Sequence, residues 1–156
     1  MSHPRDRRRV ALQVLYQIDS GGFADDDPGL RQAISEALDE TELDEGTVND
    51  GIQLAREAWS HQEQADATLE PLSPDWPIRR QPMIDRNLLR LAWYEMNIAG
   101  TPPKVVISEA VDLAREFSTA QSPSFVNGVL DRLYQDQRTG PVNEQEPAPP
   151  ETADES

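Results

Sequence analysis

The side chains best suited to chemistry lie near the N-terminus, where four arginines follow one another closely: Arg5, Arg7, Arg8 and Arg9. If this segment is a helix, Arg5, Arg9, Leu12 and Tyr16 fall on one stripe beside its apolar face. Guanidinium groups neutralise phosphates and a tyrosine ring stacks on a base, so this combination suits single-stranded RNA. The arginines also oppose the helix dipole, so stability does not explain them. A solvated helix start, with Tyr16 at the edge of the core, remains the open alternative.

Catalytic or metal chemistry finds little support elsewhere in the sequence. The segment His61-Gln62-Glu63 has the H-x-E spacing of zinc deaminases, but no C-x-x-C follows, because the chain contains no cysteine. The only other histidine is His3, so no set of zinc ligands is apparent. No glycine-rich phosphate loop follows a strand, since the pattern predicts no strands. We therefore expect a protein that is not an enzyme and uses no metal or cofactor.

Charge is distributed unevenly along the 156 residues, whose net charge is −15. The net charge is +3 over residues 1–18, −14 over 19–75, +1 over 76–139 and −5 over 140–156. Such an acidic body repels nucleic acid in general and attracts a basic protein partner, while the N-terminus offers a local basic patch. No apolar run could span a membrane, and the N-terminus lacks the apolar core of a signal peptide. We therefore expect a cytoplasmic protein with no membrane partner.

Apolar positions recur with the helical period along most of the chain, and no strand or hairpin signal stands out. The first predicted helix spans about residues 4–19, because Pro4 suits a first helical position and two glycines end the pattern. A second helix is predicted to begin at Asp27-Pro28, and a third to span about 44–58. Residues 61–71 either continue the third helix or form a short helix of their own.

Three prolines within residues 71–77 form the clearest internal break. Beyond it, one helix is predicted to begin near Pro82 and to end at Gly100. A second follows from Pro103, and the last opens at Ser122-Pro123. Six helices with short links, three on each side of the break, predict an all-α fold of two packed three-helix bundles.

The predicted helical domain spans residues 1–139, with halves of about 1–72 and 73–139. Residues 140–156 contain four prolines and five acids but almost nothing apolar, so we expect them to form a disordered acidic tail.

Three residues interrupt the apolar pattern of the C-terminal helices. We expect Glu95 or Glu109 to satisfy a buried arginine or a helix end. Gly128 is expected to let another helix approach closely, at a cost of about 1 kcal/mol in helix propensity relative to alanine.

Four motifs follow one another between about residues 5 and 134. The first is a basic helix that runs into A-x-x-x-L-Y, which ends at Tyr16. The second is D-R-x-x-L-R-x-A-x-Y-E, from Asp85 to Glu95, and the third is I-x-E-A-V-x-L-A-[KR]-x-F, from Ile107 to Phe117. The fourth and most diagnostic is F-V-N-G-V-L-D, from Phe125 to Asp131. Together and in this order they resemble the NusB family of bacterial transcription antitermination proteins.

This resemblance implies the two-bundle all-α fold and a binding factor without a cofactor. It implies binding to the boxA element of ribosomal RNA leader transcripts as a heterodimer with NusE, a small-subunit ribosomal protein. It also implies that the complex joins elongating RNA polymerase, with other Nus factors, and suppresses termination. The residues implied to bind RNA are Arg5, Arg7, Arg8, Arg9, Tyr16, Gln121, Ser122 and Ser124. Those implied to contact NusE are Trp76, Arg79 and Asp85.

Two other interpretations stay open at this point. A similar helical domain occurs at the N-terminus of certain ribosomal RNA cytosine methyltransferases. No Rossmann-type domain follows here before the acidic tail, so we do not expect methyl transfer. The other interpretation is a helical adaptor that binds only proteins, in which the arginines meet an acidic partner.

Overall fold

Helices make up almost all of the computed structural model, which describes residues 3–21, 27–38 and 43–139. Seven α-helices lie within these ranges: α1 (Pro4–Asp19), α2 (Asp27–Leu38), α3 (Glu45–Trp59), α4 (Gln62–Leu69), α5 (Met83–Tyr94), α6 (Pro103–Phe117) and α7 (Ser122–Thr139). Shorter turns follow α4 (Glu70–Leu72), precede α5 (Ile78–Arg80) and extend it as a π-helix (Glu95–Ala99). The described ranges contain no strand, and the all-α prediction is confirmed.

The helix ends follow local chemistry that the sequence already indicates. Pro4 occupies the first turn of α1, and Gly21, just past its end, has a φ of +82° that favours glycine. At α3, the carboxylate of Asp44 caps the helix by accepting a hydrogen bond of 2.7 Å from the amide of Thr47. The chain turns at Ser60 and His61 before α4 begins. Residues 62–69 are therefore a separate short helix, which settles the alternative left open above.

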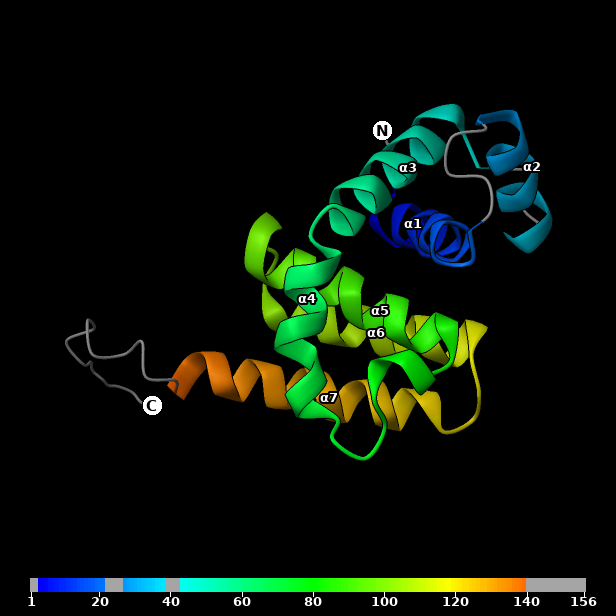
Figure 1. Ribbon diagram of the computed structural model, residues 1–156. Coiled ribbons are helices and arrows are strands. Elements are labelled where there is room, and N and C mark those ends of the chain that lie inside the picture. The colour runs from blue at the N-terminus through cyan, green and yellow to red at the C-terminus, as the bar shows by residue number, and fades with distance from the viewer. Residues whose placement is uncertain (1–2, 22–26, 39–42, 140–156) are drawn as a thin grey trace.

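The helices form two groups around a shared interface (Figure 1). Helix α1 packs against α2 and α3, while α5 packs against α4, α6 and α7. The two groups meet because α1 and α3 also contact α5, so α5 lies at the centre of the molecule. The core is aliphatic, and Leu12, Leu15, Leu88 and Leu130 are almost completely buried. The proposed halves and the extent of the domain stay predictions, and residues 140–156 lie outside the described ranges.

Helices α1 and α3 approach each other closely at Gly51. A Cβ atom placed on Gly51 would lie 2.4 Å from Cγ1 of Val10 and 2.9 Å from the carbonyl oxygen of Arg7. A Cβ atom on Gly128 would meet nothing within 4 Å. The prediction that Gly128 allows another helix to approach is therefore wrong, because its face of α7 is open and the tight crossing lies on α3.

Ion pairs join α1 to α5 and to the π-helix that extends it. Arg8 donates two hydrogen bonds of 2.8 Å to the carboxylate of Glu95, and both side chains are more than nine-tenths buried. At the other end of α1, Asp19 accepts hydrogen bonds from Arg86, Asn87 and Arg90 of α5. The prediction that Glu95 or Glu109 satisfies a buried arginine is confirmed for Glu95. No helix in the described ranges is long and apolar enough to cross a membrane.

Candidate nucleic-acid interface

Two of the four N-terminal arginines reach the surface between α1 and α6. The side chain of Arg5 is 48% exposed and donates hydrogen bonds to Glu109, at 2.9 and 3.0 Å, and to Asp112, at 2.9 Å. One turn farther along α1, Arg9 has a side chain that is only 14% exposed, and it reaches Glu116 at 2.8 Å and Asp6 at 3.3 Å. Its guanidinium carbon also lies 5.8 Å from the centre of the Phe117 ring.

The other two arginines make no hydrogen bond or ion pair with α6 within the described residues, and only Arg8 is buried. Arg8 is occupied by the buried ion pair with Glu95, so in this structure it has no surface on which to receive a phosphate. Arg7 is half-buried, and its Nε atom is enclosed without a hydrogen-bond partner among the described residues. The structure therefore gives Arg8 a structural role, whereas Arg5 and Arg9 pair with carboxylates of α6.

Tyr16 lies farther along the same helix and is 36% exposed. Leu12, which the helical stripe places between Arg9 and Tyr16, is completely buried. The predicted stripe is therefore interrupted at its centre. Tyr16 still lies seven residues, or about 10 Å, beyond Arg9 along the axis of α1. Its ring is thus available to a ligand that extends past the arginines.

The segment between α6 and α7 divides into an exposed and a buried part. Gln121 and Ser124 are exposed, as an RNA contact requires. Ser122 is buried and donates a hydrogen bond of 2.8 Å to Asp85, which also accepts one of 2.6 Å from Ser118. Asp85 itself has no exposed surface. Ser122, a predicted RNA contact, therefore binds Asp85, a predicted partner contact. Their hydrogen bond links the start of α7 to α5.

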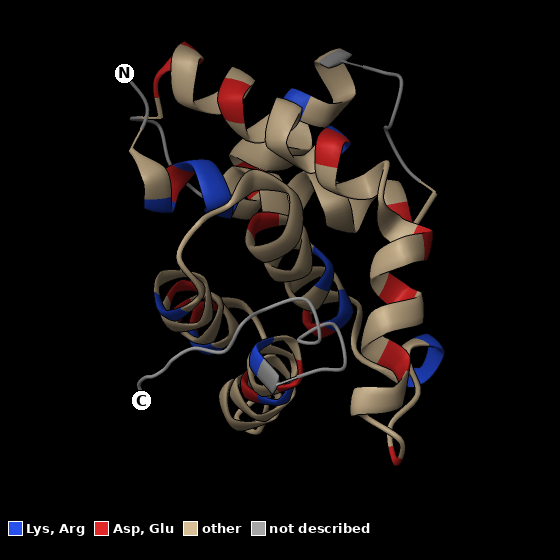
Figure 2. Ribbon diagram, turned by 90° about the vertical axis from the view of Figure 1, so that its left-hand side faces the viewer, with Lys and Arg blue, Asp and Glu red and all other residues tan. Residues whose placement is uncertain are grey.

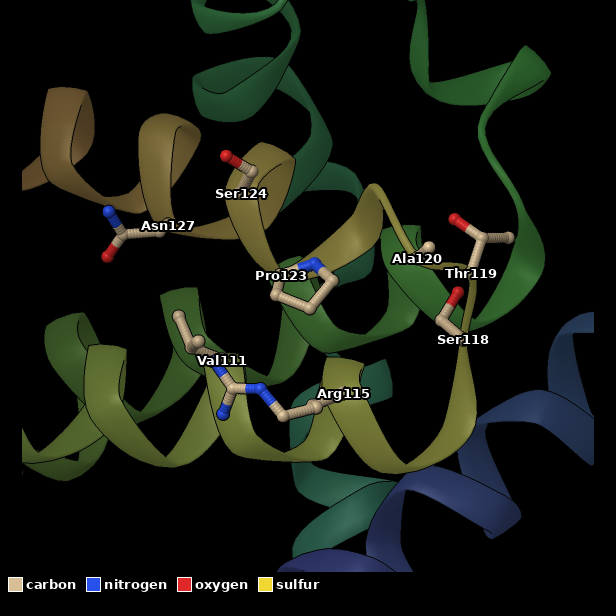
Figure 3. A pocket seen from close by; sticks show the side chains of 8 residues that line it. All are labelled: Val111, Arg115, Ser118, Thr119, Ala120, Pro123, Ser124 and Asn127. Atoms are coloured by element: carbon tan, nitrogen blue, oxygen red, sulfur yellow. The ribbon is translucent and has the colours of Figure 1, made fainter.

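A groove of about 530 Å³ opens beside this segment (Figure 3). Its lining combines side chains of α6, the connecting segment and α7: Val111, Arg115, Ser118, Thr119, Ala120, Pro123, Ser124 and Asn127. The sequence analysis did not predict Arg115 or Asn127 as site residues, although they lie in the third and the fourth of the four motifs. Arg115 donates a hydrogen bond of 2.9 Å to Asp112, the carboxylate that also accepts from Arg5. Asp112 therefore connects Arg115, which lines the groove, to Arg5 of α1.

The residues predicted to meet a protein partner occupy a different place. Trp76 packs edge-on against Phe125, with ring centres 4.7 Å apart, beside a second groove of about 530 Å³. Arg79 is exposed in the turn before α5, and Asp85 is buried as described above. Phe125 therefore contributes to the packing around Trp76, and Tyr16 is the more exposed of the two aromatic side chains.

The α1–α6 surface is electrostatically balanced rather than purely basic. Figure 2 shows acidic and basic segments beside each other in the first turns of α1, close to the end marked N. Hydrogen bonds from Arg5 hold the pKa of Glu109 below its ordinary value, against the opposing effect of partial burial. The same hydrogen bonds raise the pKa of Arg5. These shifts favour the charged forms of Arg5 and Glu109, and a phosphate that binds here meets arginines that already have carboxylate partners.

This fold and this surface place the chain among small helical binding proteins. A model of the NusB family matches residues 5–135. Transcription antitermination protein NusB of Desulfitobacterium hafniense (strain DSM 10664 / DCB-2) is 38% identical over 129 residues, which cover 82% of this chain and 85% of that protein. The chain therefore belongs to the NusB family, whose members are transcription antitermination proteins and not enzymes.

Solved structures agree with this assignment. T. maritima NusB superimposes with a TM-score of 0.67 at 30% identity, covering 87% of this chain and 94% of that one. A chain from the crystal structure of the antitermination factors NusB and NusE in complex with dsRNA gives a TM-score of 0.67 at 26% identity. That match covers 85% of this chain and 96% of the other.

Proposed function

We propose that this protein binds the boxA element of ribosomal RNA leader transcripts together with NusE and so supports antitermination by elongating RNA polymerase with the other Nus factors. The observation that carries the proposal is the position of Arg5 and Arg9, which reach the surface of α1 next to the groove between α6 and α7. Membership of the NusB family supports it further, as does the likeness to a chain crystallised with NusE and RNA.

The proposed RNA site runs from α1 to the groove. Arg5 and Arg9 supply phosphate contacts, which position the strand without reading its sequence. Tyr16 offers a ring on which a base can stack. Gln121 and Ser124 supply hydrogen-bonding groups at the groove, where exposed bases can be distinguished. Arg8 and Ser122 have no part in this proposed contact surface, because both are buried and engaged within the protein.

The proposed NusE site lies around Trp76 and Arg79, before α5. Trp76 and Phe125 form an aromatic wall along the groove there, and such rings are frequent anchors of protein interfaces. The acidic body would steer a basic ribosomal protein to this surface. A basic partner would also add phosphate contacts to an RNA site whose own arginines are few.

A titration with two RNAs tests the proposal. Binding of a boxA RNA and of a scrambled RNA of equal length is measured with the full chain, with and without NusE. We expect tighter binding of boxA than of the scrambled RNA, and a further gain when NusE is present. Equal affinities for both RNAs with NusE present would contradict the proposal, and binding of NusE without any binding of RNA would favour a helical adaptor instead.

A further inference from the structure

Three carboxylates of α6 face α1 at the spacing i, i+3 and i+7. These are Glu109, Asp112 and Glu116, and each lies within hydrogen-bond distance of an arginine of α1. The spacing places them along one face of α6, so the two helices are joined by a row of ion pairs. Both surface arginines of the proposed RNA site thus have carboxylate partners on another helix.

The balance of charge in this row is slightly negative. Three arginines (Arg5, Arg9 and Arg115) meet four carboxylates (Asp6, Glu109, Asp112 and Glu116) within the contacts described. Arg5 contacts two of these carboxylates, and so does Arg9. A carboxylate and a phosphate use the same bidentate geometry toward a guanidinium group. The carboxylates therefore occupy donor positions that an RNA phosphate would take.

We propose that Glu109, Asp112 and Glu116 are specificity-determining residues that compete with RNA phosphates for Arg5 and Arg9. This inference rests on the proposed function. It adds a mechanism by which the site discriminates against RNA that lacks the boxA sequence. An RNA that offers only its backbone must displace the carboxylates and gains little from doing so. An RNA that also makes base contacts, or that arrives with a basic protein, has additional free energy with which to displace them.

The competition also predicts how binding responds to salt. When a phosphate replaces a carboxylate, counterions leave the RNA, but cations gather around the freed carboxylate. The net release of counterions is therefore small, and binding to the wild-type protein depends weakly on salt. If the carboxylates are neutralised, cations no longer gather around them, and each contact between an arginine and a phosphate gives its full net release of counterions. The slope of log K against log salt then becomes steeper by roughly 0.7 per contact.

The test uses the full chain with Glu109→Gln, Asp112→Asn and Glu116→Gln together. The matched control is Glu63→Gln, Asp131→Asn and Asp136→Asn, which makes the same change in net charge at exposed positions away from α1. Affinity for boxA RNA and for scrambled RNA is measured over a series of salt concentrations, with NusE present. We expect the α6 variant to bind both RNAs more tightly, with the larger gain for scrambled RNA and a slope steeper by about 1.4 for two contacts.

The outcomes separate this inference from the proposed function. If the wild type discriminates between the two RNAs and the α6 variant has the same affinities and salt dependence, the inference is overturned and the proposed function still stands. A lack of discrimination in the wild type would overturn the function itself. An equal gain in the α6 variant and the control would assign the effect to net charge and also overturn the inference. If thermal unfolding shows that the triple variant is not folded, Glu116→Gln alone is used, with a smaller gain of the same kind as the expected result.

Discussion

At the residue scale, two neighbouring arginines of α1 have opposite roles. Arg8 points into the protein and binds Glu95, while Arg9 points toward α6 and the surface. Successive positions on a helix differ by 100°, so one of two adjacent side chains can face the core while the other faces solvent. The buried pair satisfies both charges with two hydrogen bonds, and an unpaired charge in its place would be costly.

Replacing one member of the buried pair tests the structural role of Arg8. We expect Arg8→Met to lower the free energy of unfolding by about 3–5 kcal/mol, because it leaves the Glu95 carboxylate buried without its partner. The double variant Arg8→Met/Glu95→Met should recover most of this loss, since both charges are removed together. Urea unfolding followed by circular dichroism provides the measurement. A double variant as unstable as the single one would show that the pairing is not the cause.

The residue scale also marks the limit of what the sequence could predict about the site. The cluster of arginines and their place at the start of a helix follow from residue type and spacing. The division between buried Arg8 and surface Arg9 does not, because their carboxylates lie 87 and 107 positions away along the chain. The same holds for Ser122, whose partner Asp85 is 37 positions distant. Periodicity describes one helix at a time, and these contacts depend on how helices are placed relative to one another.

At the scale of elements, the crossing of α1 and α3 depends on a missing side chain. Because Gly51 has no side chain, Val10 can lie where the Cβ atom of any other residue would overlap it. The apolar periodicity predicted both helices well, and Pro4 at the first helical position indicated where α1 begins. It did not identify the crossing point, because a glycine inside a helix has the same propensity cost whether its face is packed or open.

Two glycine substitutions test the crossing. Gly51→Ala is expected to lower the free energy of unfolding by about 1–3 kcal/mol, because the new methyl group overlaps Val10 and the backbone of Arg7. Gly128→Ala serves as the control and should raise it by about 0.5–1 kcal/mol, since the new methyl group meets open space and favours the helix. Thermal or urea unfolding of both variants gives the comparison. Equal effects at the two positions would argue against a tight crossing at Gly51.

At the scale of the whole molecule, Asp19 helps to hold the two groups of helices together. It lies at the end of α1 and accepts hydrogen bonds from Arg86, Asn87 and Arg90 of α5, while Arg90 also pairs with Asp66 of α4. Burial by itself would raise the pKa of Asp19. The hydrogen bonds from Arg86 and Asn87 and the charges of the arginines outweigh burial and hold this pKa below its ordinary value of 3.8.

The lowered pKa of Asp19 predicts a pH-dependent contribution to stability. A carboxylate whose pKa is lower in the folded state stabilises the fold fully above its unfolded value, and the effect is lost as pH falls through the folded value. We therefore expect Asp19→Asn to lower the free energy of unfolding by about 1.5–3 kcal/mol at neutral pH. The difference in free energy of unfolding between this variant and the wild type should become smaller below pH 3.8. Urea unfolding across this range provides the measurement, and a gap that stays constant would contradict the assignment.

The molecule's overall charge limits which residues can carry RNA binding. With a net charge of −15, the protein as a whole repels nucleic acid, so RNA binding depends on a small number of well-placed guanidinium groups. The uneven charge distribution and the all-α class could be predicted from the sequence. The carboxylates of α6 that accompany these arginines could not, because they come from another part of the chain.

The most direct measurement compares the wild type with the double variant Arg5→Gln/Arg9→Gln in binding to boxA RNA, with NusE present. The control is Arg31→Gln/Arg138→Gln, which removes the same charge from α2 and α7. We expect the α1 variant to bind about tenfold more weakly or worse, because a hydrogen bond to a charged group contributes about 1.5 kcal/mol or more. The control should bind nearly as the wild type does. Wild-type affinity in the α1 variant, with the fold intact by circular dichroism, would contradict RNA binding by the α1 arginines.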